Sequence, residues 1–330
     1  MQPQRIEVIA DDAGQRVDVL VDGEPFTSYV YTDTLAVLKK PVLYPVRTAE
    51  GVPITRGYPL EQRPGERIDH PHQIGYWLNY GSVGGLDFWN NSSAIPAERA
   101  HEMGTIRHLA IESTESGDGA GHLIATSAWM NSKGDVLLNE RTHFVFRATP
   151  GVRIIDRFTT LTAGDEDVSF ADHKEGVLGL RMTRALEMPA AEPVDVVGPD
   201  GSVVSSSDNT GINGAYLNSE GVEGYPDVWA KRARWMTLSG VLAGADSVTV
   251  AILDHPENPG HPTYWHARDY GLFAANPLGQ AVFSDGMERL DFALASGAST
   301  TFRYRLVIFS GNTSPAQVEA WYDEFVTTEL

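Results

Sequence analysis

Valines occupy every second position from Val17 to Val21, and the dipeptide Asp22-Gly23, a signal for a hairpin turn, follows directly. The same period of two recurs at 144–146, 248–252 and 302–308, with Gly, Pro and Asp between such segments. Alternation of this kind is typical of strands with one buried face, and strands that alternate with long helices are missing. The sequence therefore predicts an all-β protein, built as a large antiparallel β-sandwich.

One helix is predicted at about residues 314–328, near the C-terminus. Ser314 can cap it, Pro315 suits its first position, and Gln317 completes a capping box. The apolar residues of one face follow at helical spacing, namely Val318, Trp321 and Phe325. We expect this helix to dock on a sheet.

The segment 192–225 is rich in Gly, Ser, Asp and Asn, and strand-like segments continue on both sides of it. We interpret it as long loops that cross one sandwich rather than as a linker. Residues 1–330 are therefore predicted to form a single β-sandwich domain with a C-terminal helix.

Composition excludes several classes of partner and chemistry. The net charge of −19 disfavours nucleic acid and anionic membrane surfaces, and the absence of cysteine excludes disulfides and thiolate metal sites. No run approaches the ~18 apolar residues of a membrane span, and the first residues lack the pattern of a signal peptide. We expect a cytoplasmic protein. Nucleotide-binding glycine loops and the Gly-x-Ser-x-Gly elbow are also missing, so no organic cofactor is expected.

Five of the ten histidines and three of the seven tryptophans lie in two windows, 69–89 and 254–268. The first begins with Asp69-His70-Pro71-His72. In an extended segment His70 and His72 would project to the same side, and Pro71 would place them at a sheet edge or rim. Two imidazoles so placed can ligate a divalent metal, although a third ligand is needed. The alternative is a pair of histidines hydrogen-bonded to the backbone near a turn, and metal dependence stays open.

The second window contains His266 and Arg268, which would share one side of a strand. The arginine could hold a hydroxyl or a carboxylate while the imidazole exchanges a proton. The alternative is a surface arginine paired with Asp269. Asp254-His255 could be a buried carboxylate–imidazole pair or a tight turn.

A third segment, 172–176, places Glu175 two residues after His173. A glutamate held near a histidine can act as a base while the imidazole acts as an acid. A charged strand face would give the same pattern. A catalytic role for this segment is supported only if the fold brings it close to the other histidines.

Together these segments resemble a family of bacterial proteins labelled PmoA, or "methane oxygenase PmoA". The resemblance spans about residues 40–310. The motifs that carry it are Pro45, Gly51-Val52-Pro53-Ile54-Thr55-Arg56, Asp69 to His72, Gly75-Tyr76-Trp77, Gly85-Leu86-Asp87-Phe88-Trp89, Lys174-Glu175-Gly176, Arg181, Asp254-His255-Pro256, Trp265 to Arg268, Tyr270-Gly271 and Asn276-Pro277. The family pattern leads us to expect a third histidine where this chain has Gln73.

This resemblance implies a sandwich similar to that of the galactose mutarotase group, encoded in a gene neighbourhood of sugar oxidoreductases and transporters. It does not imply methane oxidation, because the methane monooxygenase subunit of that name spans the membrane. This is an analogy at the level of the fold, which does not by itself establish a function.

From residues and resemblance together, we expect an enzyme of sugar catabolism that cleaves a glycoside or an oxidised (keto) sugar by acid–base hydrolysis or β-elimination. The catalytic candidates are His72, Glu175 and His266. The residues expected to contact the substrate are His70, Trp77, Trp89, Lys174, Arg181, His255, Trp265 and Arg268, with the three indoles as a stacking platform. A divalent metal, if present, would be held by His70 and His72. The alternatives are an aldose mutarotase or epimerase, a sugar-binding protein without catalysis, and a structural subunit.

Overall fold

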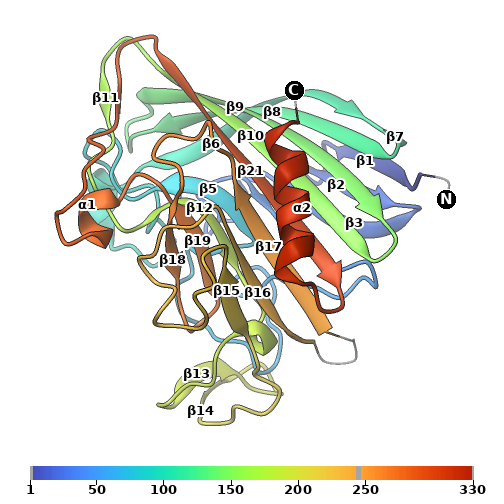
Figure 1. Cartoon of the computed structure of the whole chain (residues 1–330). Helices are drawn as coiled ribbons and strands as arrows, with labels where there is room; N and C mark the ends of the chain where they lie inside the picture. The colour runs from blue at the N-terminus through green and yellow to red at the C-terminus, as the bar shows by residue number, and fades with distance from the viewer. Residues whose placement is uncertain (1–2, 243–246, 329–330) are drawn as a thin grey trace.

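The computed structural model describes residues 3–242 and 247–328, which form two large antiparallel sheets that face each other (Figure 1). The nine-stranded sheet has the order β18-β19-β12-β5-β4-β3-β2-β1-β7. In chain order its strands are β1 (Arg5–Asp11), β2 (Arg16–Val21), β3 (Glu24–Val30), β4 (Val42–Leu43), β5 (Tyr76–Tyr80), β7 (Gly117–Asp118), β12 (Gly176–Arg181), β18 (Tyr264–Ala267) and β19 (Leu272–Asn276).

The eight-stranded sheet has the order β15-β16-β17-β21-β10-β9-β8-β6. Its strands are β6 (Thr105–Glu115), β8 (Ala120–Met130), β9 (Val136–Thr149), β10 (Val152–Ala163), β15 (Ala215–Asn218), β16 (Trp235–Val241), β17 (Ser247–Asp254) and β21 (Ser299–Ser310). Every neighbouring pair in both sheets is antiparallel. The predicted all-β antiparallel sandwich is therefore confirmed.

Two small two-stranded sheets lie outside this sandwich. One pairs β11 (Val168–Ser169) with β20 (Ala293–Leu294), and the other pairs β13 (Val194–Val197) with β14 (Val203–Ser206). The second pair, together with β15 of the eight-stranded sheet, corrects our interpretation of 192–225 as loops alone. Figure 1 shows β13 and β14 projecting below the main sheets. The side chains of β14 are mostly exposed, so this strand has no buried apolar face that the sequence could have revealed.

The core between the sheets is filled by the alternating apolar residues that the sequence marked. Val17, Val19 and Val21 of β2 are all buried in it. Asp22 and Gly23, with φ of 52° and 83°, make the hairpin turn to β3, since both turn positions need the left-handed region that Gly tolerates best. The strand predicted from the period-two valines and the hairpin turn predicted at Asp22-Gly23 are thus both confirmed.

The C-terminal helix α2 (Pro315–Val326) carries the predicted capping box, in which the Ser314 and Gln317 side chains each bond to the other's backbone N–H. It packs on the outer face of the eight-stranded sheet through Val318, Tyr322 and Phe325. Trp321, expected on this face, is only partly buried. The other helical segments are short, namely α1 (Gln280–Phe283) and the 3₁₀ turns η1 (Ala97–Glu102) and η2 (Arg184–Leu186). None of the helices among the described residues is long and apolar enough to cross a membrane.

Four strands of the nine-stranded sheet, β5, β12, β19 and β18, share an outer surface that we call the site face. Trp77, Gly179, Ala274 and His266 lie opposite one another across the four strands in register. The alternate residues Leu178, Leu180, Trp265 and Ala267 belong to the core between the sheets. Because side chains alternate along a strand, Arg181, His266 and Arg268 project on the site face.

Candidate functional site

The Asp69–His72 segment lies in a turn that precedes β5, not in an extended strand as expected. His70 has a φ of 43°, and its carbonyl accepts a hydrogen bond from Gln73 N at 3.0 Å. The left-handed backbone at His70 turns the chain, so the two imidazoles do not project side by side. Their ring centroids are nevertheless 5.7 Å apart, in an edge-to-face arrangement.

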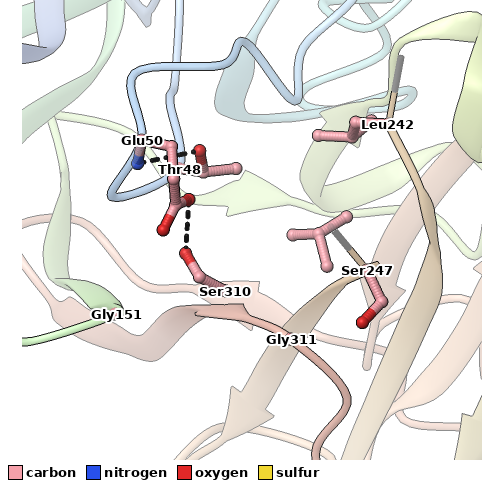
Figure 2. Close-up of a pocket in the computed structure, with 8 residues that line it drawn as sticks. Thr48, Glu50, Gly151, Leu242, Ser247, Ser310 and Gly311 are labelled. Atoms are coloured by element: carbon pink, nitrogen blue, oxygen red, sulfur yellow. Dashed lines mark hydrogen bonds between the residues drawn. The ribbon is translucent and has the colours of Figure 1, made fainter. Parts of the chain in front are cut away.

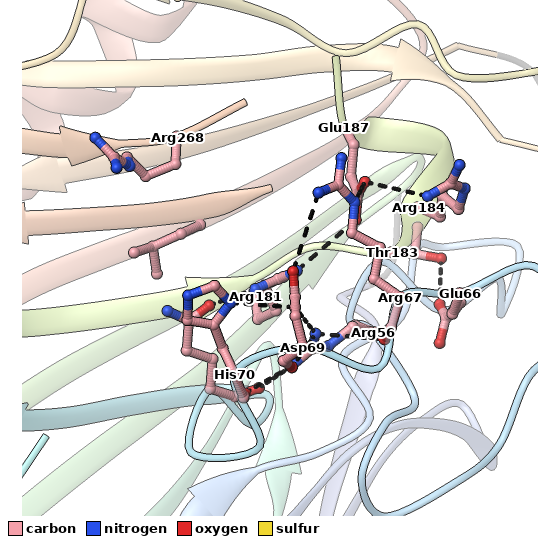
Figure 3. Close-up of polar contacts among 12 residues, drawn as sticks. Arg56, Glu66, Arg67, Asp69, His70, Arg181, Thr183, Arg184, Glu187 and Arg268 are labelled. Carbon is pink, nitrogen blue, oxygen red and sulfur yellow. Dashed lines mark hydrogen bonds and ion pairs between the residues drawn. The ribbon is translucent and has the colours of Figure 1, made fainter. Parts of the chain in front are cut away.

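Two buried arginines hold this turn in place (Figure 3). Arg56 donates to the Asp69 carboxylate at 2.6 Å and to the carbonyls of Asp69, His70 and Gln73 at 2.8 to 3.1 Å. Arg181 donates to Asp69 Oδ1 at 2.7 Å and to Gln73 Oε1. Although burial opposes it, the adjacent His70 ring, with Nδ1 3.3 Å from Asp69 Oδ1, and the charges of Arg181 and Arg56 hold the pKa of Asp69 well below its usual value. The turn is thus fixed by charge-assisted bonds on both sides.

This arrangement corrects the expected role of Arg181. Its side chain is 0% exposed, and its terminal nitrogens are engaged by Asp69 and Gln73, so it positions the turn rather than contacting a substrate. Gln73, where the resemblance led us to expect a histidine, accepts a hydrogen bond from this buried guanidinium. Behind it, Arg67 donates to the fully buried Glu187 at 2.7 Å.

His70 stacks on Tyr270, with ring centroids 4.8 Å apart and planes 12° apart. Tyr270 lies in the turn between β18 and β19, and the Arg181 guanidinium lies 4.7 Å from its ring centroid. This tyrosine joins the histidine turn to the edge strands. Sequence reasoning assigned it no role, and its only signal was its place in a motif of the resemblance.

The partly buried His72 and the buried Lys40 lie next to each other in the site. Burial, together with the charges of Lys40, His70 and two arginines, lowers the pKa of His72 to about 2, so its imidazole is neutral at physiological pH. Lys40 donates to the His72 carbonyl at 2.7 Å and lies 5.1 Å from the Trp77 ring centroid. Burial lowers the pKa of Lys40 to about 7. No sequence pattern pointed to this lysine.

Glu175 and His266 meet on the site face. Oε2 of Glu175 lies 3.6 Å from Nδ1 of His266, and Oε1 lies 3.5 Å from Nζ of Lys174. Burial raises the pKa of Glu175. Burial and the charge of Arg268 lower the pKa of His266 to about 3. A carboxyl that keeps its proton more readily than usual therefore faces a neutral imidazole, which is an arrangement suited to proton transfer. The sequence analysis named both residues as catalytic candidates but did not predict that they lie together.

Lys174 and His173 flank this pair in different ways. Lys174 is half exposed beside Glu175, and its contact with a substrate stays a prediction. His173 instead serves the fold, because its carbonyl accepts from Asn276 at 2.9 Å and its Nδ1 accepts from the backbone N–H of Glu175 at 3.2 Å.

The three tryptophans do not form an open stacking platform, and this expectation is wrong. Trp77, Trp89 and Trp265 are at most 1% exposed. Trp77 packs on Trp89 beneath the site face, at 5.2 Å between centroids, and Trp265 lies in the core between the sheets. Their large apolar rings fill the interior, so the presence of these three tryptophans is explained by packing and does not require a bound sugar.

His255 is also outside the site. It packs edge-on against Phe325 of α2, on the outer face of the other sheet, and it accepts from Glu257 N. Asp254 pairs with His261 instead, at 2.9 Å, and bonds to Thr263 N and Asn258. The alternative of a structural turn is therefore correct for Asp254-His255.

Among the described residues, no group of three or more histidine or acidic side chains is arranged to hold a metal ion. The His70 and His72 rings are close, but the nearest carboxylate to His70, that of Asp69, is already engaged by two arginines. Metal binding at these histidines stays a prediction.

A cavity of about 260 Å³ lies elsewhere, between Glu50 and the end of β21 (Figure 2). Glu50 accepts a hydrogen bond from Ser310 there. The lining of this cavity contains no histidine and none of the candidate site residues. We therefore place the candidate site by its chemistry, on the site face.

No curated protein matches this chain. Among solved structures, it is similar to an α-galactosidase of Lactobacillus brevis, with 12% identity, 90% of this chain and 40% of that chain covered, and a TM-score of 0.41. An α-galactosidase of Geobacillus stearothermophilus is 10% identical, with 92% of this chain and 40% of that chain covered and a TM-score of 0.39. Galactose 1-epimerase of Lactobacillus acidophilus is 11% identical, with 93% of this chain and 98% of that chain covered and a TM-score of 0.35. The chain thus spans about two fifths of the α-galactosidase chains. At these TM-scores the likeness carries no argument about activity.

Residues 16–323 match the model of a family described as "Family of unknown function (DUF6807)". The matched range includes the histidine turn, Glu175, His266 and Arg268. Since the match covers most of its 330 residues, the chain belongs to the DUF6807 family.

Proposed function

We propose that this protein is a carbohydrate-active enzyme that binds a sugar over the site face and cleaves it by acid–base chemistry. The observation that carries the proposal is the Glu175–His266 pair, 3.6 Å apart, with pKa values displaced in opposite directions. Groups whose surroundings separate their pKa values in this way are typical of acid–base sites. The reaction classes that fit are hydrolysis of a glycoside and β-elimination from an oxidised (keto) sugar.

In this proposal Glu175 exchanges the proton with the substrate, since its carboxyl is partly open to solvent while His266 is 1% exposed. His266 is then a positioning residue, which keeps the carboxyl oriented and in an environment of low polarity. The neutral imidazole of His72 is the second candidate for proton transfer. His70, Tyr270 and Lys174 supply hydrogen-bonding groups at the rim.

The assignment of an enzyme to sugar catabolism rests on chemistry rather than on the solved structures above. Carboxylate, imidazole, phenol and guanidinium groups gathered on one face match the many hydroxyls of a sugar. The relation to proteins labelled PmoA and a cytoplasmic location also stay predictions.

The test is product analysis on a panel of aryl glycosides, their 3-keto derivatives and free aldoses, followed by proton NMR. Release of the aglycone with uptake of water supports hydrolysis, and release with a new carbon–carbon double bond supports β-elimination. A change in anomer ratio without release would instead support the mutarotase or epimerase. Binding without any turnover would support the sugar-binding alternative and contradict our proposal.

A further inference from the structure

Arg268 is a cation without an acidic partner. None of the ion pairs formed by the described residues includes it, and its Nε is buried without a hydrogen-bond acceptor. Asp269, its neighbour in sequence, does not pair with it, so the alternative of a surface ion pair is wrong. In Figure 3 Arg268 lies apart, without a dashed line to any other residue drawn. Arg268 as a whole is only partly buried, but a buried polar atom usually has a hydrogen-bond partner, and the Nε of Arg268 has none.

The side chain is nevertheless held in a defined place. Its guanidinium lies 5.9 Å from the ring centroids of both Tyr225 and Tyr270. The backbone around it is fixed as well, because Arg268 N donates to Leu272 O and the Tyr216 hydroxyl donates to Arg268 O. Arg268 is therefore preorganised by aromatic rings and backbone bonds rather than by a carboxylate.

The neighbouring arginines, unlike Arg268, each have a carboxylate partner. Arg56 and Arg181 both bond to Asp69, and Arg67 bonds to Glu187. Arg268 lies on the same face as Arg181, on the other side of Leu272, and two residues after His266. The partner missing from Arg268 would thus lie beside the Glu175–His266 pair.

The negative net charge of the whole chain makes the lack of a carboxylate partner at Arg268 more unexpected. With a net charge of −19, the protein has many carboxylates that could have neutralised Arg268, and none does so among the described residues. An acidic surface also does nothing to attract an acidic ligand. Recognition of an anion would therefore depend on a specific contact at this one place.

We propose that the substrate is a sugar acid and that Arg268 holds its carboxylate beside Glu175 and His266. The planar guanidinium matches a carboxylate in shape and can donate two parallel hydrogen bonds to it. A phosphate fits less well, because the single guanidinium would face a dianion close to the Glu175 carboxyl. This inference rests on the proposed sugar-binding function and adds the class of sugar.

The test compares equilibrium binding of matched pairs by calorimetry, namely glucuronate with glucose and galacturonate with galactose. We expect the acid of at least one pair to bind about tenfold or more tightly than its neutral partner. Arg268→Gln should lose this preference but still bind the neutral sugar, and Arg268→Lys should keep only part of it. Arg289→Gln, at an exposed arginine on the surface, is the matched control and should keep the preference.

Thermal unfolding of each variant shows whether it is folded, and Arg268→Lys serves if Arg268→Gln is not. Binding of both members of each pair with equal affinity, or a preference that survives in Arg268→Gln, would overturn the inference while leaving the sugar-binding proposal intact. Failure to bind any of the four sugars would contradict both. Tighter binding of glucose 6-phosphate than of glucuronate, lost in Arg268→Gln, would overturn the choice of a carboxylate.

Discussion

The Glu175 carboxyl lies 3.6 Å from the His266 imidazole, although the two residues belong to different parts of the chain and to segments two strands apart in the sheet. Glu175 directly precedes β12, and His266 lies in β18, with β19 between them. Burial raises the pKa of the first and lowers that of the second. The fold thus assembles an acid–base pair that neither sequence segment contains by itself.

The pH profile of activity should report the raised pKa of Glu175. If this carboxylate acts as the base, kcat/KM should increase with pH through an apparent pKa above the usual value of glutamate. Lys174→Met should move this limb to still higher pH, because the charge of Lys174 lowers the pKa of Glu175. Lys133→Met, at an exposed lysine, is the control. A limb that stays in place in Lys174→Met would contradict the assignment.

His266→Gln should make the protein less sensitive to acid. The folded state lowers the pKa of His266 from 6.5 to about 3, so the unfolded chain binds a proton that the folded chain does not. Stability from this group is therefore full above pH 6.5 and decreases as the pH falls towards 3. The contribution of His266 to the free energy of unfolding is therefore about 2 kcal/mol smaller at pH 5 than at pH 7. Urea unfolding at pH 7 and pH 5 measures it.

In His266→Gln the loss of unfolding free energy between these pH values should be smaller than in wild type by about this amount. His101→Gln, at an exposed histidine, should behave as wild type. An unchanged pH dependence in His266→Gln would mean that His266 is not held neutral by burial.

Gly179→Ala should destabilise the site face. A Cβ at this position would lie 2.4 Å from the Trp77 ring, which packs over the glycine from the neighbouring strand. The indole is fully buried and cannot move aside freely, so we expect a loss of about 1–3 kcal/mol in chemical denaturation. Gly164→Ala, where a Cβ meets only ordinary contacts at 3.6 Å, is the control. Equal stability of the two variants would contradict this packing.

Asp69→Asn should destabilise the histidine turn strongly. The change removes the carboxylate from Arg56 and Arg181, both at most 1% exposed, and leaves their charges buried. We expect a cost of about 3–5 kcal/mol. Asp18→Asn, which breaks the exposed pair with Arg16, should cost less than about 1 kcal/mol. Similar values for the two variants in urea unfolding would show that the turn is not held by this pair of arginines.

The fold could be predicted further than the site. Period-two valines, the Asp22-Gly23 turn and the capping box of Ser314 and Gln317 are local signals, and the structure follows each of them. Site residues depend on contacts between distant segments, which one sequence does not contain. Asp69 and Arg181 are 112 residues apart, and nothing in either segment indicates that they bond.

The errors have a common physical cause. Trp265 and His255 lie in motifs rich in polar groups, yet the first is needed in the core and the second packs under α2. Burial, which decides between these roles, is not visible in composition. His266 and Arg268 were placed correctly because strand alternation alone puts them on one face.

Turnover by Glu175→Gln tests the central claim most directly. The measurement is kcat/KM on a substrate identified by the product analysis, with binding of the same substrate measured in parallel. Because general acid–base groups contribute about 10²- to 10⁴-fold, Glu175→Gln should lose at least about 10²-fold in rate while binding is retained. Glu166→Gln, at an exposed surface glutamate, should be as active as wild type. A Glu175→Gln variant that turns the substrate over at the rate of wild type would contradict the account.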